Sequence, residues 1–280
     1  MWAVHSRLFD TNSGIFASDG QALLVDPGIF PEEVQEILAT TARQHLSIQA
    51  VLLTHSHWDH ILGPESLPGT PVIAQAAFDK TAAGQKEIIL SEIAAWETEH
   101  HIPRPKPFDL PAPDLIFEKE LEFFLGEESL RFLAAPGHTP DQCVVYHLAS
   151  ESLWAADMLS DLEIPFVSSS LAAYRRTLAM IAGLELRSLV PGHGRPTHDQ
   201  QEIQARLAGD RAYLDELAEK VGQAVTQGKS MEETVNFCAG ISYRQGAENA
   251  GPHRLNVESA YLEAGGDPGG RVEAGWVQVG

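Results

Sequence analysis

The most informative stretch of the chain is Thr54-His55-Ser56-His57-Trp58-Asp59-His60, which directly follows the apolar run Ile48–Leu53. It places three imidazoles and one carboxylate within six residues. Zinc, iron and manganese all bind imidazole and carboxylate, and a loop at the end of a strand can turn several such side chains toward one point. A polar surface loop with solvated histidines is the alternative, and the density of histidine disfavours it. The motif therefore predicts a metal site.

Three shorter motifs farther along the chain carry the same residue types, and each follows an apolar run typical of a strand. They are Pro136-Gly137-His138-Thr139-Pro140-Asp141, Trp154-Ala155-Ala156-Asp157 and Pro191-Gly192-His193-Gly194. An earlier turn, Asp26-Pro27-Gly28, follows the apolar run Ala22–Val25. These motifs add one carboxylate and two histidines to the candidate ligands.

With these motifs in this order, the sequence over roughly residues 1–200 resembles the metallo-β-lactamase superfamily, whose HxHxDH motif is followed by His, Asp and His. The resemblance implies an α/β fold, a four-layer αββα sandwich, with a C-terminal helical appendage beyond it. It also implies seven metal ligands: His55, His57 and His138 for one ion, Asp59, His60 and His193 for a second, and Asp157 as the bridge between them. The turn at residues 26–28 is expected to support the metal loop.

The activity that the resemblance implies is hydrolysis by a binuclear metal centre. Two divalent ions, zinc in the first place with iron or manganese as alternatives, would share a bridging hydroxide that forms near neutral pH because the ions stabilise the anion. One ion would polarise the oxygen under attack, and Asp59 would orient the hydroxide as well as bind metal. The expected substrate is a small ester, thioester or lactone, in a cleft covered by residues 62–114 and the C-terminal helices.

Other functions remain open within the same superfamily. One is a persulfide dioxygenase-like enzyme with a single iron, which the complete second ligand set disfavours; another is a phosphodiesterase or nuclease. A binding module without turnover is a third alternative, and a degenerate site of that kind would be expected to lack some ligands. Two positions differ from particular branches: Asp157 stands where some β-lactamases have cysteine, and His57 stands where flavodiiron enzymes have glutamate.

Composition limits the partners and the location. The 280 residues include 19 Lys and Arg against 39 Asp and Glu, a formal net charge of −20, which opposes binding to nucleic acid. The two cysteines, Cys143 and Cys238, form no CxxC pair, so no disulfide framework is indicated. No signal peptide and no long apolar run is apparent, so we expect a cytoplasmic protein without membrane contact. The expected partner is a small-molecule substrate, with a homodimer as a weaker prediction.

Hydrophobic patterning predicts strands that alternate with helices. The predicted strands are Trp2–Phe9, Ala22–Val25, Ile48–Leu53, Pro71–Ala74, Leu121–Leu125, Leu130–Ala134, Cys143–Leu148, Ser152–Ala155 and Arg187–Val190. The predicted helices are Pro31–Arg43, Ala76–His100, Leu171–Gly183, Gln200–Gln227, Met231–Phe237 and Asn256–Glu263. We expect two parts, the sandwich over 1–200 and a helical extension over 201–280 that packs on it and ends in a loose tail from Gly265. The proline-rich segment His101–Asp114 is predicted to be extended and to act as a lid.

The remaining histidines and several charged residues receive structural interpretations. His100 and His101 are expected at an exposed helix end, Tyr174 in the packing of a helix, and Trp58 in the pocket wall. His5, His45, His147, His198 and His253 lack partners at metal-ligand spacing. Arg175, Arg176 and Arg195 could bind an anionic group, although a solvated helix face is favoured for the pair. The C-terminal region resembles the helical ends of glyoxalase II-like hydrolases but lacks a cluster of basic side chains that could bind glutathione.

Overall fold

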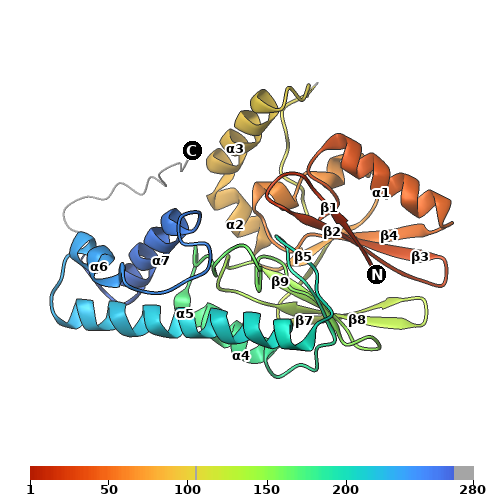
Figure 1. The fold of residues 1–280 in the computed structure, drawn as a ribbon. Helices are drawn as coiled ribbons and strands as arrows, with labels where there is room; N and C mark the ends of the chain where they lie inside the picture. The colour runs from red at the N-terminus through yellow and green to blue at the C-terminus, as the bar shows by residue number, and fades with distance from the viewer. Residues whose placement is uncertain (105, 268–280) are drawn as a thin grey trace.

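The computed structural model describes residues 1–104 and 106–267. The first of two β-sheets has the strand order β1 (Trp2–His5), β2 (Asn12–Ser18), β3 (Gln21–Val25), β4 (Ser47–Leu52), β5 (Val72–Gln75) and β6 (Leu115–Phe117). The second has the order β11 (Ser188–Val190), β10 (Ser152–Trp154), β9 (Cys143–His147), β8 (Glu128–Ala134) and β7 (Glu120–Leu125). The sheets lie face to face and helices cover the outer face of each, which confirms the αββα sandwich (Figure 1).

The side chains of the central strands alternate between two apolar layers. One layer lies between the two sheets, and the other lies between a sheet and its outer helices. On β3, Leu23 and Val25 point between the sheets, where they join Trp154 and Phe132. Leu24 points to the other face and packs with residues of the outer helices. Because neighbouring residues of a strand face opposite sides, a strand that is buried on both faces is apolar at nearly every position.

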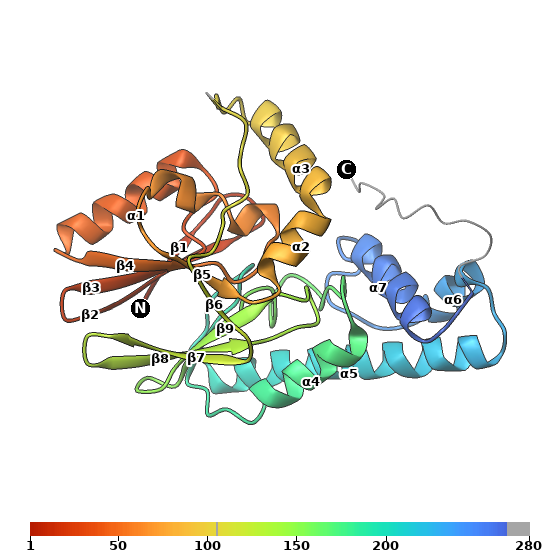
Figure 2. The same cartoon turned by 180° about the vertical axis from the view of Figure 1, so that it is seen from behind.

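Three helices cover the first sheet: α1 (Pro31–Arg43), α2 (Phe78–Gly84) and α3 (Lys86–Glu99) (Figure 2). The predicted bounds of α1 are confirmed, because Pro31 fits the first helical turn and the Glu33 carboxylate accepts a hydrogen bond from the Phe30 amide at 3.1 Å. The single helix predicted over Ala76–His100 is wrong. The chain forms two helices there, separated at Gln85 directly after Gly84, a residue with low helix propensity.

Two strands were absent from the expected pattern. β2 begins with Asn12, Ser13 and Gly14, a polar start that hides its β character although the structure buries all three residues. β6 has only three residues and follows the proline-rich segment. The predicted strand Trp2–Phe9 ends earlier, at His5, because the chain turns back into β2.

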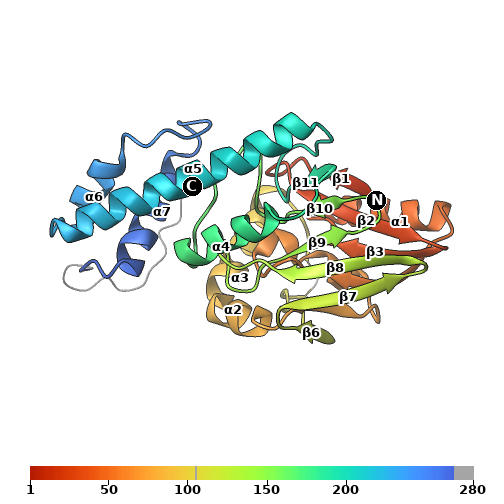
Figure 3. The ribbon, with the colours of Figure 1, turned by 90° about the horizontal axis from the view of Figure 1, so that it is seen from below.

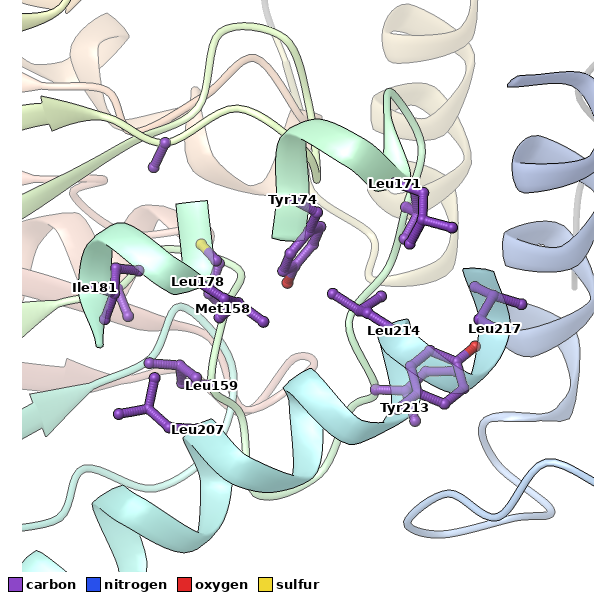
Figure 4. Close-up of a cluster of buried hydrophobic side chains, with 14 of the residues drawn as sticks. Met158, Leu159, Leu171, Tyr174, Leu178, Ile181, Leu207, Tyr213, Leu214 and Leu217 are labelled. Carbon is purple, nitrogen blue, oxygen red and sulfur yellow. The ribbon is translucent and has the colours of Figure 1, made fainter. Parts of the chain in front are cut away.

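The second sheet is covered by α4 (Leu171–Ile181) and the 27-residue helix α5 (Gln200–Thr226). Apolar side chains of the two helices form one buried cluster with the loop after β10; Tyr174, Leu178 and Leu214 lie near its centre (Figure 4). The helix α5 extends beyond the sandwich, where α6 (Met231–Cys238) and α7 (Ala250–Glu263) pack against it (Figure 3). The expected C-terminal helices are therefore present, although α7 begins six residues before the predicted Asn256.

The segment between α3 and β6 has no helix or strand in its described residues. Phe108 is buried, and the Arg104 side chain donates to the Glu97 and Glu65 carboxylates. The lid role of this segment stays a prediction, as does the division into residues 1–200 and 201–280. The predicted loose tail from Gly265 lies for the most part outside the described residues. Among the helices described, none combines the length and apolar character needed to cross a membrane.

Candidate metal centre

The HxHxDH motif lies in the loop that follows β4, and the preceding turn supports it as expected. The Asp26 carboxylate accepts hydrogen bonds from the Thr54 amide at 2.8 Å, from the Thr54 hydroxyl at 2.6 Å and from His60 Nδ1 at 3.0 Å. Asp26 is buried at the end of β3, the strand beside β4. One carboxylate therefore orients both the start of the loop and its last histidine.

The three remaining ligand candidates come from the ends of three strands of the second sheet. His138 follows β8, Asp157 follows β10, and His193 follows β11. Each histidine is oriented through its other ring nitrogen: His138 Nδ1 donates to the Phe166 carbonyl at 2.9 Å, and His193 Nδ1 donates to the Phe9 carbonyl at 2.9 Å. Since the proton is on Nδ1 in this arrangement, Nε2 is left as a free lone pair in the neutral ring.

These side chains converge on the Asp157 carboxylate. Its oxygens lie 3.5 Å from His55 Nε2, 3.2 Å from His60 Nε2, 3.2 Å from His138 Nε2 and 3.3 Å from His193 Nε2. Two groups have ligand atoms that all lie within 4.8 Å of one another: His55, His57, His138 and Asp157 in one, and Asp59, His60 and His193 in the other. The structure thus brings the seven predicted residues together in two groups, with Asp157 in the group of His55, His57 and His138 and its oxygens also 3.2 and 3.3 Å from His60 and His193 of the other group.

The residues fit divalent metal ions. His138 Nε2 lies 3.0 Å from His57 Nδ1, and His60 Nε2 lies 3.3 Å from His193 Nε2, separations at which two lone pairs repel unless a proton or a cation lies between them. Within the described residues, His55 Nε2 and Asp157 Oδ1 are buried and have no hydrogen-bond partner. Buried polar atoms rarely remain unpaired, and neutral imidazole with carboxylate is a donor set for zinc or iron.

The electrostatics of the cluster reflect its crowding. Burial and the neighbouring His138 and His55 hold the pKa of His57 well below its usual value, so this ring is neutral. Burial opposes the charge on His193, but the carboxylates of Asp157 and Glu163 outweigh it and raise the pKa of His193 to about 10. Burial alone would raise the pKa of Asp157, yet the surrounding histidines hold it well below its usual range. The surrounding histidines therefore favour the anionic form of the Asp157 carboxylate, the form that binds a metal ion.

The helix α7 supports the segment that follows Asp157, whose Phe166 carbonyl orients His138. The sequence did not indicate this role. Three side chains spaced seven residues apart, one on the N-cap residue directly before α7 and two on the helix itself, hydrogen bond to the backbone of the segment 162–172 that follows Asp157. Asn249 Oδ1 accepts from the Ile164 amide at 3.3 Å, and Asn256 Oδ1 accepts from the Val167 amide at 2.7 Å. Glu263 Oε2 accepts from the Leu171 amide at 2.6 Å.

Asn256 is the central member of this ladder, which comprises Asn249, Asn256 and Glu263. It is fully buried, and its Nδ2 donates to the Pro165 carbonyl at 2.7 Å and to the Tyr213 hydroxyl at 2.9 Å. Its amide therefore brackets Phe166, whose carbonyl orients His138. In the sequence, the only sign of this ladder is the seven-residue spacing of its three polar residues. That spacing alone does not identify the segment to which they bond.

The residues given structural interpretations lie outside both ligand groups as far as the structure describes the chain. His198 Nδ1 lies 2.9 Å from the Ser188 hydroxyl, and His253 Nδ1 lies 3.0 Å from the Tyr213 hydroxyl. Tyr174 is buried and donates to the Asp157 carbonyl at 3.2 Å. Arg175 pairs with Asp215 at 2.7 Å, which engages one of the proposed anion-binding groups.

Comparison with known proteins gives the same family. Residues 6–193 match the family model described as metallo-beta-lactamase superfamily. The chain is 27% identical to Glyoxylase B2 of Dictyostelium discoideum over 128 residues, 46% of this chain and 41% of that protein. It is 30% identical to a hydroxyacylglutathione hydrolase of Psychromonas ingrahamii over 157 residues, 55% of this chain and 49% of that protein. The chain thus spans about half the length of these curated relatives.

Among solved structures, the stereoselective inverting sec-alkylsulfatase Pisa1 from Pseudomonas sp. has a similar fold. Its TM-score is 0.69 at 19% identity, over 93% of this chain and 48% of that chain. At this identity the likeness concerns the fold alone. The family model, in contrast, covers more than half of the sequence and includes every motif from Asp26 to His193. The chain belongs to the metallo-beta-lactamase superfamily.

Proposed function

We propose that this chain is a metal-dependent hydrolase that uses two divalent metal ions to cleave a small ester, thioester or lactone. The observation that carries the proposal is the convergence of four buried histidine nitrogens on the Asp157 carboxylate, at 3.2–3.5 Å. The hydrolase name of the Psychromonas relative supports the same class. A small uncharged substrate also suits a chain with a net charge of −20.

In this proposal the ligands divide as the two groups do. His55, His57 and His138 hold one ion, Asp59, His60 and His193 hold the other, and Asp157 lies between the two groups. Two divalent ions would supply Lewis acidity and would make water acidic enough to react near neutral pH. Zinc is the proposed metal, with iron or manganese as alternatives.

The chain's own residues supply orientation. The Phe166 and Phe9 carbonyls keep the Nδ1 protons of His138 and His193 and so direct each Nε2 into the site. Asp26 does the same for His60. Asp59 is buried and lies 3.4 Å from His193 Nε2, and we infer that it orients the attacking water as well as binding metal.

We also propose a location, an assembly and the partners of the protein. We infer a cytoplasmic protein that acts without a membrane or nucleic-acid partner, and a homodimer as the assembly to test by light scattering. Polyanions are repelled by the net charge of −20.

The test is elemental analysis of the purified protein, together with turnover of matched lactone, thioester, carboxylic ester and phosphodiester substrates. Two zinc ions per chain with turnover of an ester-type substrate would support the proposal. One iron per chain with oxygen uptake on a persulfide would replace it with the dioxygenase alternative, and turnover of the phosphodiester alone would replace it with the nuclease alternative. His198→Ala is the matched control, because His198 bonds to Ser188 and belongs to neither ligand group.

A further inference from the structure

Two phenylalanine rings border the metal centre, one beside each ligand group. The Phe9 ring lies 6.5 Å from the His193 ring and 6.1 Å from the Trp58 ring, both in edge-to-face geometry. The Phe166 ring lies 5.8 Å from the His138 ring. Because His193 and His138 belong to different groups, the two rings flank the centre on different sides.

Both the solvent exposure and the backbone conformation of Phe9 are unfavourable for a large apolar residue. Its side chain is 56% exposed, and its φ of 55° lies in the left-handed region that non-glycine residues avoid. Asp10 beside it has a φ of 50°. The turn is fixed by the His193 ring and by the Gly194 amide, which donates to the Asp10 carbonyl at 2.9 Å. Strain and apolar exposure that coincide beside a candidate reaction centre indicate a contact surface for another molecule.

Phe166 is also held through its backbone. The Asn256 side chain bonds to the backbone on both sides of it, at Pro165 and Val167, and the Phe166 carbonyl is engaged by His138. The ring itself is only partly buried. Both rings are therefore fixed through their backbones, and each still exposes part of its apolar surface.

We propose that Phe9 and Phe166 bind an apolar group of the substrate, an aryl or alkyl group. The inference deepens the proposed function and rests on it.

The experiment compares 4-nitrophenyl esters that share a leaving group: the acetate, the butyrate and longer acyl esters. We expect kcat/KM of the wild type to rise with acyl length, because each methylene that reaches a ring adds buried apolar area. A kcat/KM that does not rise with acyl length would overturn the proposal.

The apolar contact is tested with Phe9→Ala and Phe166→Ala. Each should raise KM for the longer acyl esters by about tenfold and leave the acetate nearly unchanged, because only a long group reaches the ring. Phe124→Ala is the matched control, an exposed phenylalanine of the second sheet at the β7–β8 hairpin, 65% exposed. Equal KM values in Phe9→Ala, Phe166→Ala and the wild type would overturn the assignment.

Binding without turnover separates this inference from the proposed function. 4-Nitrobutyranilide, the amide counterpart of the butyrate ester, is titrated calorimetrically into the metal-loaded protein, with metal content measured in parallel. If no ester is cleaved but the anilide binds and Phe9→Ala weakens it, the proposed function fails and the apolar site stands. If esters are cleaved and the anilide binds equally to wild type and both variants, the function stands and the apolar site fails.

Discussion

The loop Thr54–His60 and the segment after Asp157 support the same centre in different ways. The first loop carries four of the seven candidate ligands and is fastened by Asp26, a residue of the neighbouring strand in the same sheet. The segment after Asp157 is fastened from outside the sandwich by the α7 ladder. One half of the centre is thus supported locally, and the other half depends on a helix that begins about ninety residues later.

This difference changes the meaning of the C-terminal helices. A helical appendage could be a dimer contact or a cover for the substrate, yet α7 instead supplies hydrogen-bond partners for backbone groups beside the centre. Buried backbone groups need such partners, so the segment 162–172 depends on α7 for its conformation.

The largest effect is expected where the two halves meet. Asp157→Ala should lower kcat/KM by roughly a hundredfold or more and reduce metal content, because it removes the carboxylate on which four histidine nitrogens converge. Elemental analysis and steady-state kinetics on the same preparation measure both. His198→Ala should keep the metal content of the wild type; a loss there equal to that in Asp157→Ala would contradict the ligand assignment.

The local support is tested next. Asp26→Asn keeps the shape of the side chain but removes an acceptor that serves Thr54 and His60. We expect metal affinity to fall by about 10- to 100-fold, the usual effect of losing a group that orients a ligand. Competition with a chromophoric chelator measures the affinity. An unchanged affinity would show that the loop holds its histidines without Asp26.

The remote support should matter less for metal and more for stability. Asn256→Ala leaves the Val167 amide and the Pro165 carbonyl without partners, so we expect a loss of about 2–4 kcal/mol in the free energy of unfolding. Denaturant titration measures it. Metal affinity should fall by about tenfold through Phe166 and His138.

Asn236→Ala is the matched control for that substitution. Asn236 lies exposed on α6, where its side chain bonds only to the Glu232 carbonyl of its own helix among the contacts described. We expect stability and metal affinity close to the wild type. If Asn256→Ala also kept full metal affinity, α7 would stabilise the fold without positioning the ligand.

The smallest effect concerns pH. Burial lowers the pKa of His253, which faces the Tyr213 hydroxyl, the Cys238 carbonyl, the Tyr243 ring and the charge of Lys220. A histidine that is harder to protonate in the folded state stabilises the fold above its unfolded pKa, and this contribution is lost as pH falls toward the folded value. The melting temperature should therefore decrease as the pH is lowered from about 7.5 to about 5.5. His253→Gln should reduce this slope relative to the wild type.

The parts of the fold that the sequence predicted are those with local signals. Pro31 followed by two glutamates marks the start of α1, and the apolar runs mark the central strands. The strand β2 was missed because its buried residues Asn12 and Ser13 are polar: Asn12 bonds to the Pro191 carbonyl, and Ser13 accepts from the Gly28 amide. Those partners are far along the chain, so no local pattern reveals them.

The candidate site shows the same division. The seven ligand candidates could be named because the family motif specifies their order, although their separation along the chain says nothing of distance. The start of α7 was missed because Gly251-Pro252 is typical of a break, whereas proline is tolerated in a first helical turn. Phe9 and Phe166 carried no signal, since their role depends on a carbonyl and on a ring that the fold places beside a histidine.

The ladder on α7 also restricts how the chain length can change. Each step of seven residues along the ladder, a rise of about 10.5 Å along a helix, corresponds to three residues of the facing segment, Ile164 to Val167, and then to four, Val167 to Leu171. Adding or deleting one residue within α7 would turn every later side chain by about 100° and remove Glu263 from Leu171. Insertions there are tolerable only as whole pairs of helical turns, together with a matching insertion in the segment 162–172. The length of α7 and the length of the segment 162–172 can therefore change only together.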